Sequence, residues 1–286
     1  MSGNFTSPTE PLSVGRVVTA GVRLYRSHLK EYFFIALKAY FWLFIPIYGW
    51  AKFYALSSLI SRLAFGELVN QPETVSSGER FVNSRLWQFL LTMILMFFIG
   101  LGAGIGFIII TSLILAIPSR LLGGFQSDNS TNMIIFILIG IIVYIAALIG
   151  IAWFFTRFYL VDIPLAVEEN IDSSSTIGRS WELTKGHVGR IMLISFISFL
   201  IISFLIVVPL QIIVQIVIRI IQGLMAAMLR ENNPLFYLLY FIIVMGLSFS
   251  SGALIVPFWQ TVKAVVYYDL RSRREGLGLQ LRDYDL

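Results

Sequence analysis

The stretch Ser173–Arg190, SSSTIGRSWELTKGHVGR, is a polar and charged helix candidate that lies between two long apolar blocks. It contains His187, one of only two histidines in the chain. A second polar stretch, Leu12–Lys30, lies near the N-terminus and also runs directly into an apolar block. Polar helices that border apolar blocks are typical of membrane interfaces. The stretch therefore predicts that the apolar blocks on either side of it are membrane segments.

The composition predicts an integral membrane protein. Apolar residues make up 57% of the 286-residue chain and charged residues 13%, with a mean hydropathy of +0.83, whereas soluble domains carry roughly 25% charged residues. No polar block is long enough to hold a core of its own, so we expect one membrane domain over 12–268. The chain has no cysteine, which excludes disulfides, thiolate metal sites and cysteine nucleophiles.

The apolar blocks predict an all-α, polytopic helical bundle, because about 20 apolar residues suffice for one bilayer crossing. Proline and glycine in the run PIYG, residues 46–49, predict a hairpin or a sharp kink in the first block. Pro209 predicts a break in the fourth block, followed by an amphipathic outer helix at about 210–228. Six membrane segments result, at about 32–47, 50–66, 87–117, 132–160, 190–208 and 235–268.

Charge predicts the orientation of these segments. With six crossings, one side of the membrane carries 16 of the 21 Lys and Arg residues, and the other keeps Arg120, Arg219 and Arg230. The remaining two, Lys38 and Lys52, lie on either side of the predicted break in the first block. The positive-inside rule then places both termini in the cytoplasm of a bacterial cell. A single kinked span over 32–66 would oppose this rule. Residues 1–11 are expected to be disordered and 269–286 to form a basic cytoplasmic tail.

The two polar stretches resemble each other. When His28 is aligned with His187, Leu24-Tyr25-Arg26-Ser27 lies over Leu183-Thr184-Lys185-Gly186. Each copy begins with a capping group, Ser13 in the first and Asp172 with its neighbouring serines in the second. We therefore expect two related halves. Each would be preceded by an amphipathic interfacial helix, at about 12–30 and 173–189, with its basic face toward anionic lipid headgroups.

Histidine titrates near neutral pH and binds metals, so His28 and His187 have three interpretations. They are interfacial residues that bond headgroups or backbone, or a polar contact between the two halves, or a site of proton or metal chemistry. The first interpretation is favoured, because His187 has no second histidine or carboxylate one helical turn later. Neither a metal site nor a cofactor is expected.

Two further sets of residues suggest specific roles. The third segment contains two overlapping GxxxG spacings, which predict close helix packing or, alternatively, a hinge that lines a site; its residues are Gly100, Gly102, Gly104 and Gly106. A polar stripe shares one face of the outer helix: Gln211, Gln215, Arg219 and Gln222. The stripe predicts a helix in the outer interface, a cavity between helices, or packing against Glu231 or Asn232.

Other chemistry has little support in the sequence. The carboxylates of Asp162, Glu168, Glu169 and Asp172 are expected in a solvated linker with local ion pairs rather than as an acid–base pair. There is no GK[ST] phosphate loop, HExxH or GxSxG motif. The net charge of +5 is spread along the membrane flanks, so nucleic-acid binding is not expected. No catalytic residue is predicted.

Three longer stretches resemble a known family. They are LSVGRVVTAGVRLYRSHLKEYF from residue 12, TRFYLVDIPLAVEEN from 156 with RSWELTKGHVGR from 179, and VPFWQTVKAVVYYDLRSRREGLGLQL from 256. The pattern is similar to the membrane domain attached to some bacterial glycerophosphodiester phosphodiesterases and to related six-helix membrane proteins. In that family catalysis belongs to a separate soluble domain, which this chain lacks. The resemblance therefore implies the membrane architecture and not the hydrolase activity.

The sequence thus predicts a non-enzymatic integral membrane protein of the bacterial cytoplasmic membrane. Its expected role is that of a scaffold or assembly partner, with another membrane protein as partner. The alternative is a transporter or lipid-handling protein that uses a cavity between the two halves.

Overall fold

The computed structural model describes residues 12–229 and 234–275, and within these residues the chain is helical without any strand. The predictions for residues 1–11, for the tail beyond 275 and for Glu231 and Asn232 lie outside the described residues. The helices are α1 Val14–Ser27, α2 Leu29–Trp42, α3 Tyr48–Leu68, α4 Val75–Ser84, α5 Leu86–Leu122, η1 Gly124–Gln126, α6 Ser130–Thr156, α7 Asp162–Val167, α8 Ser173–Thr184, α9 Val188–Ile202, η2 Ser203–Val207, α10 Val208–Leu229 and α11 Pro234–Glu275.

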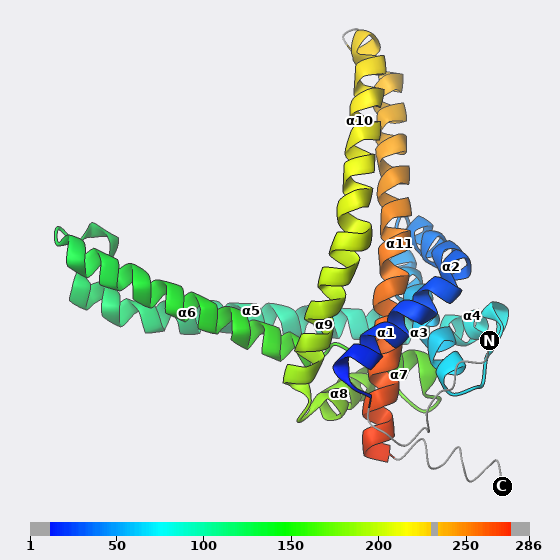
Figure 1. Ribbon diagram of the computed structural model, residues 1–286, viewed down its shortest axis with the longest axis horizontal. Coiled ribbons are helices and arrows are strands. Elements are labelled where there is room, and N and C mark those ends of the chain that lie inside the picture. Colours follow the sequence, from blue (N-terminus) through cyan, green and yellow to red (C-terminus); the bar gives the residue numbers. More distant parts are fainter. Residues whose placement is uncertain (1–11, 230–233, 276–286) are drawn as a thin grey trace.

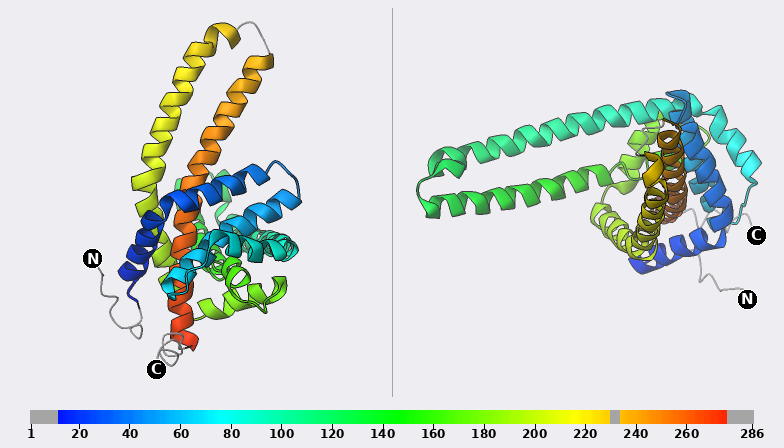
Figure 2. Two further views of the ribbon diagram at one scale, coloured as in Figure 1. Left: turned by 90° about the vertical axis from the view of Figure 1, so that its right-hand side faces the viewer. Right: turned by 90° about the horizontal axis from the view of Figure 1, so that it is seen from above.

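Two long helical hairpins leave a common base in different directions (Figures 1 and 2). We call the hairpin of α5 and α6 the first arm, and the outer parts of α10 and α11 the second arm. The base comprises α1–α4, α7 and α8 with the adjoining parts of α5, α6, α9 and α11. The lower part of α11 runs through this base and contacts α1, α2 and α3.

Among the described residues, four stretches of helix are long and apolar enough to cross a membrane: Leu86–Gln126, Ser130–Thr156, Val188–Gly223 and Tyr237–Glu275. Their most apolar windows are at most 22% buried within the chain. Such surfaces need a lipid or protein neighbour, because water solvates them poorly. The prediction of an all-α protein embedded in a membrane is thus confirmed, and these stretches match four of the six predicted segments.

The other two predicted segments, 32–47 and 50–66, form helices of a different kind. Helix α2 has 14 residues, about 21 Å at 1.5 Å per residue, which falls short of a hydrocarbon core of about 30 Å. Helix α3 has 21 residues, most of which are buried within the chain, and its sequence includes two charged residues, Lys52 and Arg62. The turn between α2 and α3 falls where the proline and glycine were expected to place it. Whether these helices cross the bilayer stays a prediction.

The predicted helix break at Pro209 is wrong. Helix α9 continues through the π-helical turn η2 into α10 without an interruption. A π turn widens the hydrogen-bonding pattern just before the proline, so the ring and its missing N–H fall where the regular pattern is already relaxed. The outer helix at 210–228 is therefore the continuation of the fifth segment.

Apolar side chains of the base form two clusters. One joins α1, α8, α9 and α11 around Tyr25, Ile191 and Val262. The other joins α2, α3, α5 and α7 around Tyr32 and Phe89. The folded core of the chain therefore lies in the base, whereas the arms expose most of their large apolar side chains.

Helix α1 packs on α11 through its apolar face. Ser13 caps the helix as predicted, accepting a hydrogen bond of 3.3 Å from the amide of Arg16. The buried residues include Val17, Val18 and Gly21. A Cβ atom at Gly21 would lie 2.9 Å from Cγ2 and 3.1 Å from Cα of Val262. The apolar face of this interfacial helix is therefore covered by protein rather than by lipid.

Two glycines of α1 give a matched test of this close approach. Replacing Gly21 by alanine forces α1 away from the backbone of α11, so we expect Gly21→Ala to destabilise the protein by about 1–3 kcal/mol. At Gly15 an added Cβ meets nothing within 4 Å, so Gly15→Ala should stabilise the helix by up to about 1 kcal/mol. The measurement is unfolding of the detergent-solubilised protein, and equal effects of the two substitutions would contradict the packing.

Candidate functional site

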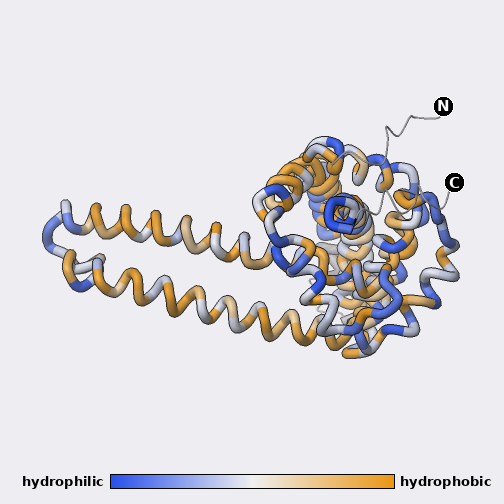
Figure 3. The backbone as a smooth tube through the Cα atoms, turned by 90° about the horizontal axis from the view of Figure 1, so that it is seen from below, coloured by the Kyte–Doolittle hydropathy of each residue, from blue (hydrophilic) through white to orange (hydrophobic). Residues whose placement is uncertain are grey.

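Hydrophilic residues are frequent in the base, whereas the first arm is mainly hydrophobic along its length (Figure 3). The lower part of α11 organises these polar groups. Its residues from 260 onward bond to α3, α7, α8, α9 and the segment before α1: they are Gln260, Lys263, Tyr267, Asp269, Arg273, Arg274 and Glu275. We call this set the polar cluster, and it is the candidate functional site.

Asp269 fixes the start of α1. One carboxylate oxygen accepts a hydrogen bond of 3.0 Å from the amide of Leu12, and the other lies 3.0 Å from both Arg190 and Arg273. The same two arginines donate to the carbonyl oxygen of Leu12. The side chain of Asp269 is only 4% exposed, so its charge is screened little by water. The two polar stretches of the sequence therefore meet here, through Leu12 and Arg190.

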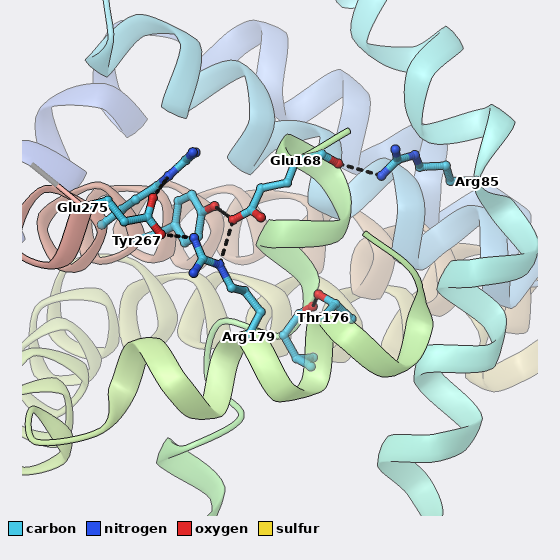
Figure 4. A network of polar contacts seen from close by, with 8 residues as sticks. Arg85, Glu168, Thr176, Arg179, Tyr267 and Glu275 are labelled. Atoms are coloured by element: carbon cyan, nitrogen blue, oxygen red, sulfur yellow. Dashed lines mark hydrogen bonds and ion pairs between the residues drawn. The ribbon is translucent and has the colours of Figure 1, made fainter. Parts of the chain in front are cut away.

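Glu168 lies at the centre of a second group of contacts (Figure 4). Its carboxylate accepts hydrogen bonds from the hydroxyl of Tyr267 and, at 3.1 Å, from Nε of Arg179. Arg179 also pairs with Glu275, which in turn pairs with Arg271 at 2.7 Å. These contacts tie α8 and the segment after α7 to the end of α11, with alternating charges that satisfy one another.

Two arginines hold the C-terminal end of α7. Arg62 donates to the carbonyl oxygen of Ala166 at 2.8 Å, and Arg85 donates to that of Glu168 at 2.7 Å. Both guanidinium groups lie over the ring of Phe81, at 3.9 and 4.5 Å from its centre. Cations are favourable at a helix C-terminus, where carbonyl groups lack partners in the helix. Helix α7 is thereby joined to α3, α4 and α5.

The expectation that Asp162 lies in a solvated linker is wrong. Its residue surface is only 1% exposed, and the amine of Lys263 lies 3.0 Å from both of its oxygens. Gln260 donates to Asp162 at 3.1 Å and accepts from Ser61 at 2.5 Å. A local ion pair was expected, but not with a residue of the last helix.

Helix α8 buries four hydroxyl side chains together with the apolar Leu183. Thr176 donates to the carbonyl oxygen of Val161 at 2.7 Å, and Ser180 to that of Arg157 at 2.9 Å. These carbonyl groups belong to the connection between α6 and α7, where regular helical partners are missing. The predicted interfacial helix at 173–189 therefore serves as a brace inside the base and differs from α1.

The cap of α8 agrees with the sequence prediction. Asp172 accepts hydrogen bonds from the side chain and amide of Ser175 and from Ser174. These bonds favour the ionised carboxylate and lower the pKa of Asp172 to about 2. The cap is therefore charged and intact at any physiological pH.

Two lysines lie at the other edge of the base. Lys38 pairs with Glu79 at 2.7 Å, and the buried amine of Lys52 donates to Asn83 at the same distance. Burial alone would raise the pKa of Glu79, but its hydrogen bonds with Lys38 outweigh this and lower it. Helix α4 thus supplies the partners of both lysines.

The two histidines bond locally. Nδ1 of His28 lies 2.9 Å from the hydroxyl of Ser27, and its Nε2 lies 3.9 Å from Glu67. Nδ1 of His187 lies 3.2 Å from the carbonyl oxygen of Lys185. The structure gives neither histidine the other as a partner, and the contact between the polar stretches is made by Leu12 and Arg190 instead.

The glycines of α5 and the stripe of α10 lie on the arms, outside the polar cluster. An added Cβ at Gly100 would meet Phe155 of α6 at 3.7 Å, whereas at Gly102, Gly104 and Gly106 it would meet nothing within 4 Å. The residues of the stripe, Gln211, Gln215, Arg219 and Gln222, are all exposed. Gln222 donates to the hydroxyl of Tyr240 on α11 at 2.9 Å.

Chemically, the polar cluster holds helices together. Its carboxylates, Asp269 and Glu275, and the carboxylate of Asp162 that Lys263 contacts are each paired with one or more cations. Among the described residues no group of three His, Cys, Asp or Glu side chains is placed to hold a metal ion. No family model, curated protein or solved structure matches the chain. The resemblance to the phosphodiesterase membrane domain therefore stays a prediction.

Sequence reasoning did not identify Asp269 and Asp162 as residues that connect distant helices. A partial signal existed for Asp269, because Arg273 follows it by four residues, a spacing that brings side chains together on a helix. No such signal existed for Asp162, whose partner Lys263 is 101 residues away.

Removing the charge of Asp162 should be costly. Asp162→Asn leaves the amine of Lys263 without its counter-ion, so we expect a loss of about 3 kcal/mol in the free energy of unfolding. The double variant Asp162→Leu with Lys263→Met removes both charges and should recover most of that loss. Glu182→Gln, at an exposed position of α8, is the control with an effect below about 0.5 kcal/mol. Unfolding in detergent measures all three, and wild-type stability of Asp162→Asn would refute the role of the pair.

Proposed function

We propose that the protein is a non-enzymatic scaffold of the bacterial cytoplasmic membrane, with both termini in the cytoplasm. The observation that carries this proposal is that the base buries its side chains whereas the arms leave theirs exposed. The base has a packed core and paired charges, whereas the apolar windows of the first arm are 0% and 6% buried within the chain. A rigid base that displays long apolar arms is suited to gathering other membrane helices.

The orientation rests on the exposed basic residues of the base. Arg23 and Arg26 of α1 and Lys30 of α2 face away from the core. At a cytoplasmic membrane surface they would attract anionic lipid headgroups, at about 1 kcal/mol for each residue. The same side of the membrane would then hold the positive charge that the positive-inside rule requires.

Helix α5 of the first arm offers a face for a partner helix. Gly102 and Gly106 are four residues apart, and the space above both is open. Glycine at this spacing lets two helices approach closely in lipid, where van der Waals packing replaces the hydrophobic effect. Since no helix of the described chain occupies the space, we propose that a helix of another membrane protein does.

Crosslinking in native membranes tests the scaffold. A photo-crosslinking residue at Ile105, which is 50% exposed on α5, should form protein adducts. The pair Gly102→Ile and Gly106→Ile should abolish them, because the added side chains keep a neighbouring helix away. Gly140→Ile on α6 is the control, since a Cβ atom added at Gly140 also meets nothing within 4 Å. Lipid adducts alone at Ile105 in the unmodified arm would refute the proposal.

The polar stripe of α10 favours a second candidate, a lipid-handling or transport function. Arg219 and three glutamines are exposed on a helix that is otherwise apolar enough to span a membrane. An arginine in that environment is costly and commonly marks a path for a polar group. A lipid headgroup is the group that such an outward-facing stripe could guide.

Reconstituted vesicles distinguish this second function. If the stripe guides headgroups, Arg219→Ala should slow exchange of fluorescent phospholipid between leaflets by about tenfold or more, a barrier increase of about 1.4 kcal/mol. Ile220→Ala, at the neighbouring exposed position, should leave the rate unchanged. Equal rates for the wild-type protein, for Arg219→Ala and for protein-free vesicles would exclude the function.

A further inference from the structure

The turn between α2 and α3 is an exposed apolar surface of the base. Its sequence from 41 to 50 is FWLFIPIYGW, which contains no charged residue. We call these ten residues the α2/α3 tip. Six of its large side chains are between 39% and 60% exposed: Phe41, Phe44, Ile45, Ile47, Tyr48 and Trp50. A patch of this kind needs a partner, because isolated proteins rarely leave so many neighbouring aromatic groups in water.

Several backbone amides of the tip form hydrogen bonds within the chain. The amides of Leu43 and Ile45 donate to carbonyl oxygens of α2 at 3.1 and 3.0 Å, and the amide of Tyr48 donates to Pro46 at 2.7 Å. Pro46 has no amide hydrogen to satisfy. Gly49 allows the two helices to close, since a Cβ there would lie 1.8 Å from the carbonyl oxygen of Trp42. These bonds lower the cost of placing the irregular backbone of the tip at membrane depth.

Polar groups limit how far the tip can enter a membrane. Lys38 lies four residues before the end of α2 and Lys52 four residues after the start of α3, so each is about 6 Å from the end of its helix. Both lysines bond to α4, through Glu79 and Asn83. Moving the charged side chains of Lys38, Lys52 and Glu79 into hydrocarbon would be costly. Only the apolar tip between these two lysines can enter the hydrocarbon.

The position of the tip along α11 gives an estimate of this depth. The rings of Tyr40, Phe41 and Phe44 contact Phe249 of α11, with centres 5.3, 6.2 and 5.4 Å apart. From Phe249 the helix continues for 15 residues to its start at Pro234, which is about 22 Å. The second arm therefore reaches far beyond the tip (Figures 1 and 2). In a hydrocarbon core of about 30 Å crossed by this arm, the tip covers only about the first 8 Å.

We propose that the α2/α3 tip inserts into the bilayer leaflet next to the base, to a depth of about 5–10 Å, and returns to the same side. Its partner is the upper acyl-chain region of that leaflet. The helices α2 and α3 then form a re-entrant hairpin instead of two crossings. The two crossings that the sequence predicts at 32–47 and 50–66 are then replaced by a hairpin, and both termini still share one side. The proposal does not depend on the scaffold role of the arms.

The absence of natural cysteine permits a direct test with single cysteines in the full-length protein. Ile45→Cys reports on the tip, Ser76→Cys on α4 at the base, and Asn232→Cys on the connection between α10 and α11. Membrane-impermeant maleimide is applied to right-side-out and to inverted native vesicles. A fluorophore at Ile45→Cys is then quenched, in vesicles of phosphatidylethanolamine and phosphatidylglycerol, by lipids that carry a nitroxide either near the headgroup or near the chain end.

We expect Ser76→Cys and Asn232→Cys to be labelled from opposite sides, and Ile45→Cys from neither side until detergent is added. Quenching at Ile45→Cys should be stronger with the shallow nitroxide than with the deep one. Labelling of Ile45→Cys from the side that labels Asn232→Cys would overturn the proposal in favour of two crossings. Ready labelling from the Ser76→Cys side, without quenching by either lipid, would overturn it by placing the tip in water.

Discussion

The buried ion pair of Asp162 and Lys263 is the contact on which the arrangement of the base depends. Asp162 belongs to α7 and Lys263 to α11, and Gln260 extends the contact to Ser61 of α3. A carboxylate that is 1% exposed cannot remain charged without a partner, so α7 and α11 are held at a fixed distance. Because α11 continues directly into the second arm, this joint also fixes the direction in which that arm leaves the base.

The division into base and arms follows from what each part can bury. Buried carboxylates of the base pair with lysine and arginine side chains. Hydroxyl groups such as those of Thr176 and Ser180 donate to backbone carbonyl oxygens, and two apolar clusters fill the spaces between the helices. The arms satisfy their backbone groups within each helix and leave their side chains to the surroundings. A bilayer supplies the missing neighbours for such helices, which is why long exposed apolar surfaces are compatible with a stable protein only in a membrane.

The two predicted halves share a backbone conformation at their histidines and differ on either side of it. His28 and His187 occupy the same kind of position between two helices, with φ and ψ of −117° and 21° in the first and −121° and 8° in the second. The helices that follow diverge, because α2 ends after 14 residues at a tight turn, whereas α9 passes through a π turn into α10. The helices before them diverge too, since α1 buries valines and α8 buries hydroxyl groups.

The sequence alone determined that the protein is helical and embedded in a membrane, because apolar content and helix length are properties of each segment by itself. It also determined the caps at Ser13 and Asp172, since capping involves residues three positions apart. Only the tertiary structure decided which polar residues connect one helix to another. Asp162 and Asp269 acquire their roles from partners on distant helices, and linear spacing carries no record of such pairs. The same reason explains why the sequence of Ser173–Arg190 did not reveal that α8 donates hydrogen bonds to the connection between α6 and α7, whereas its place at the membrane interface stays a prediction.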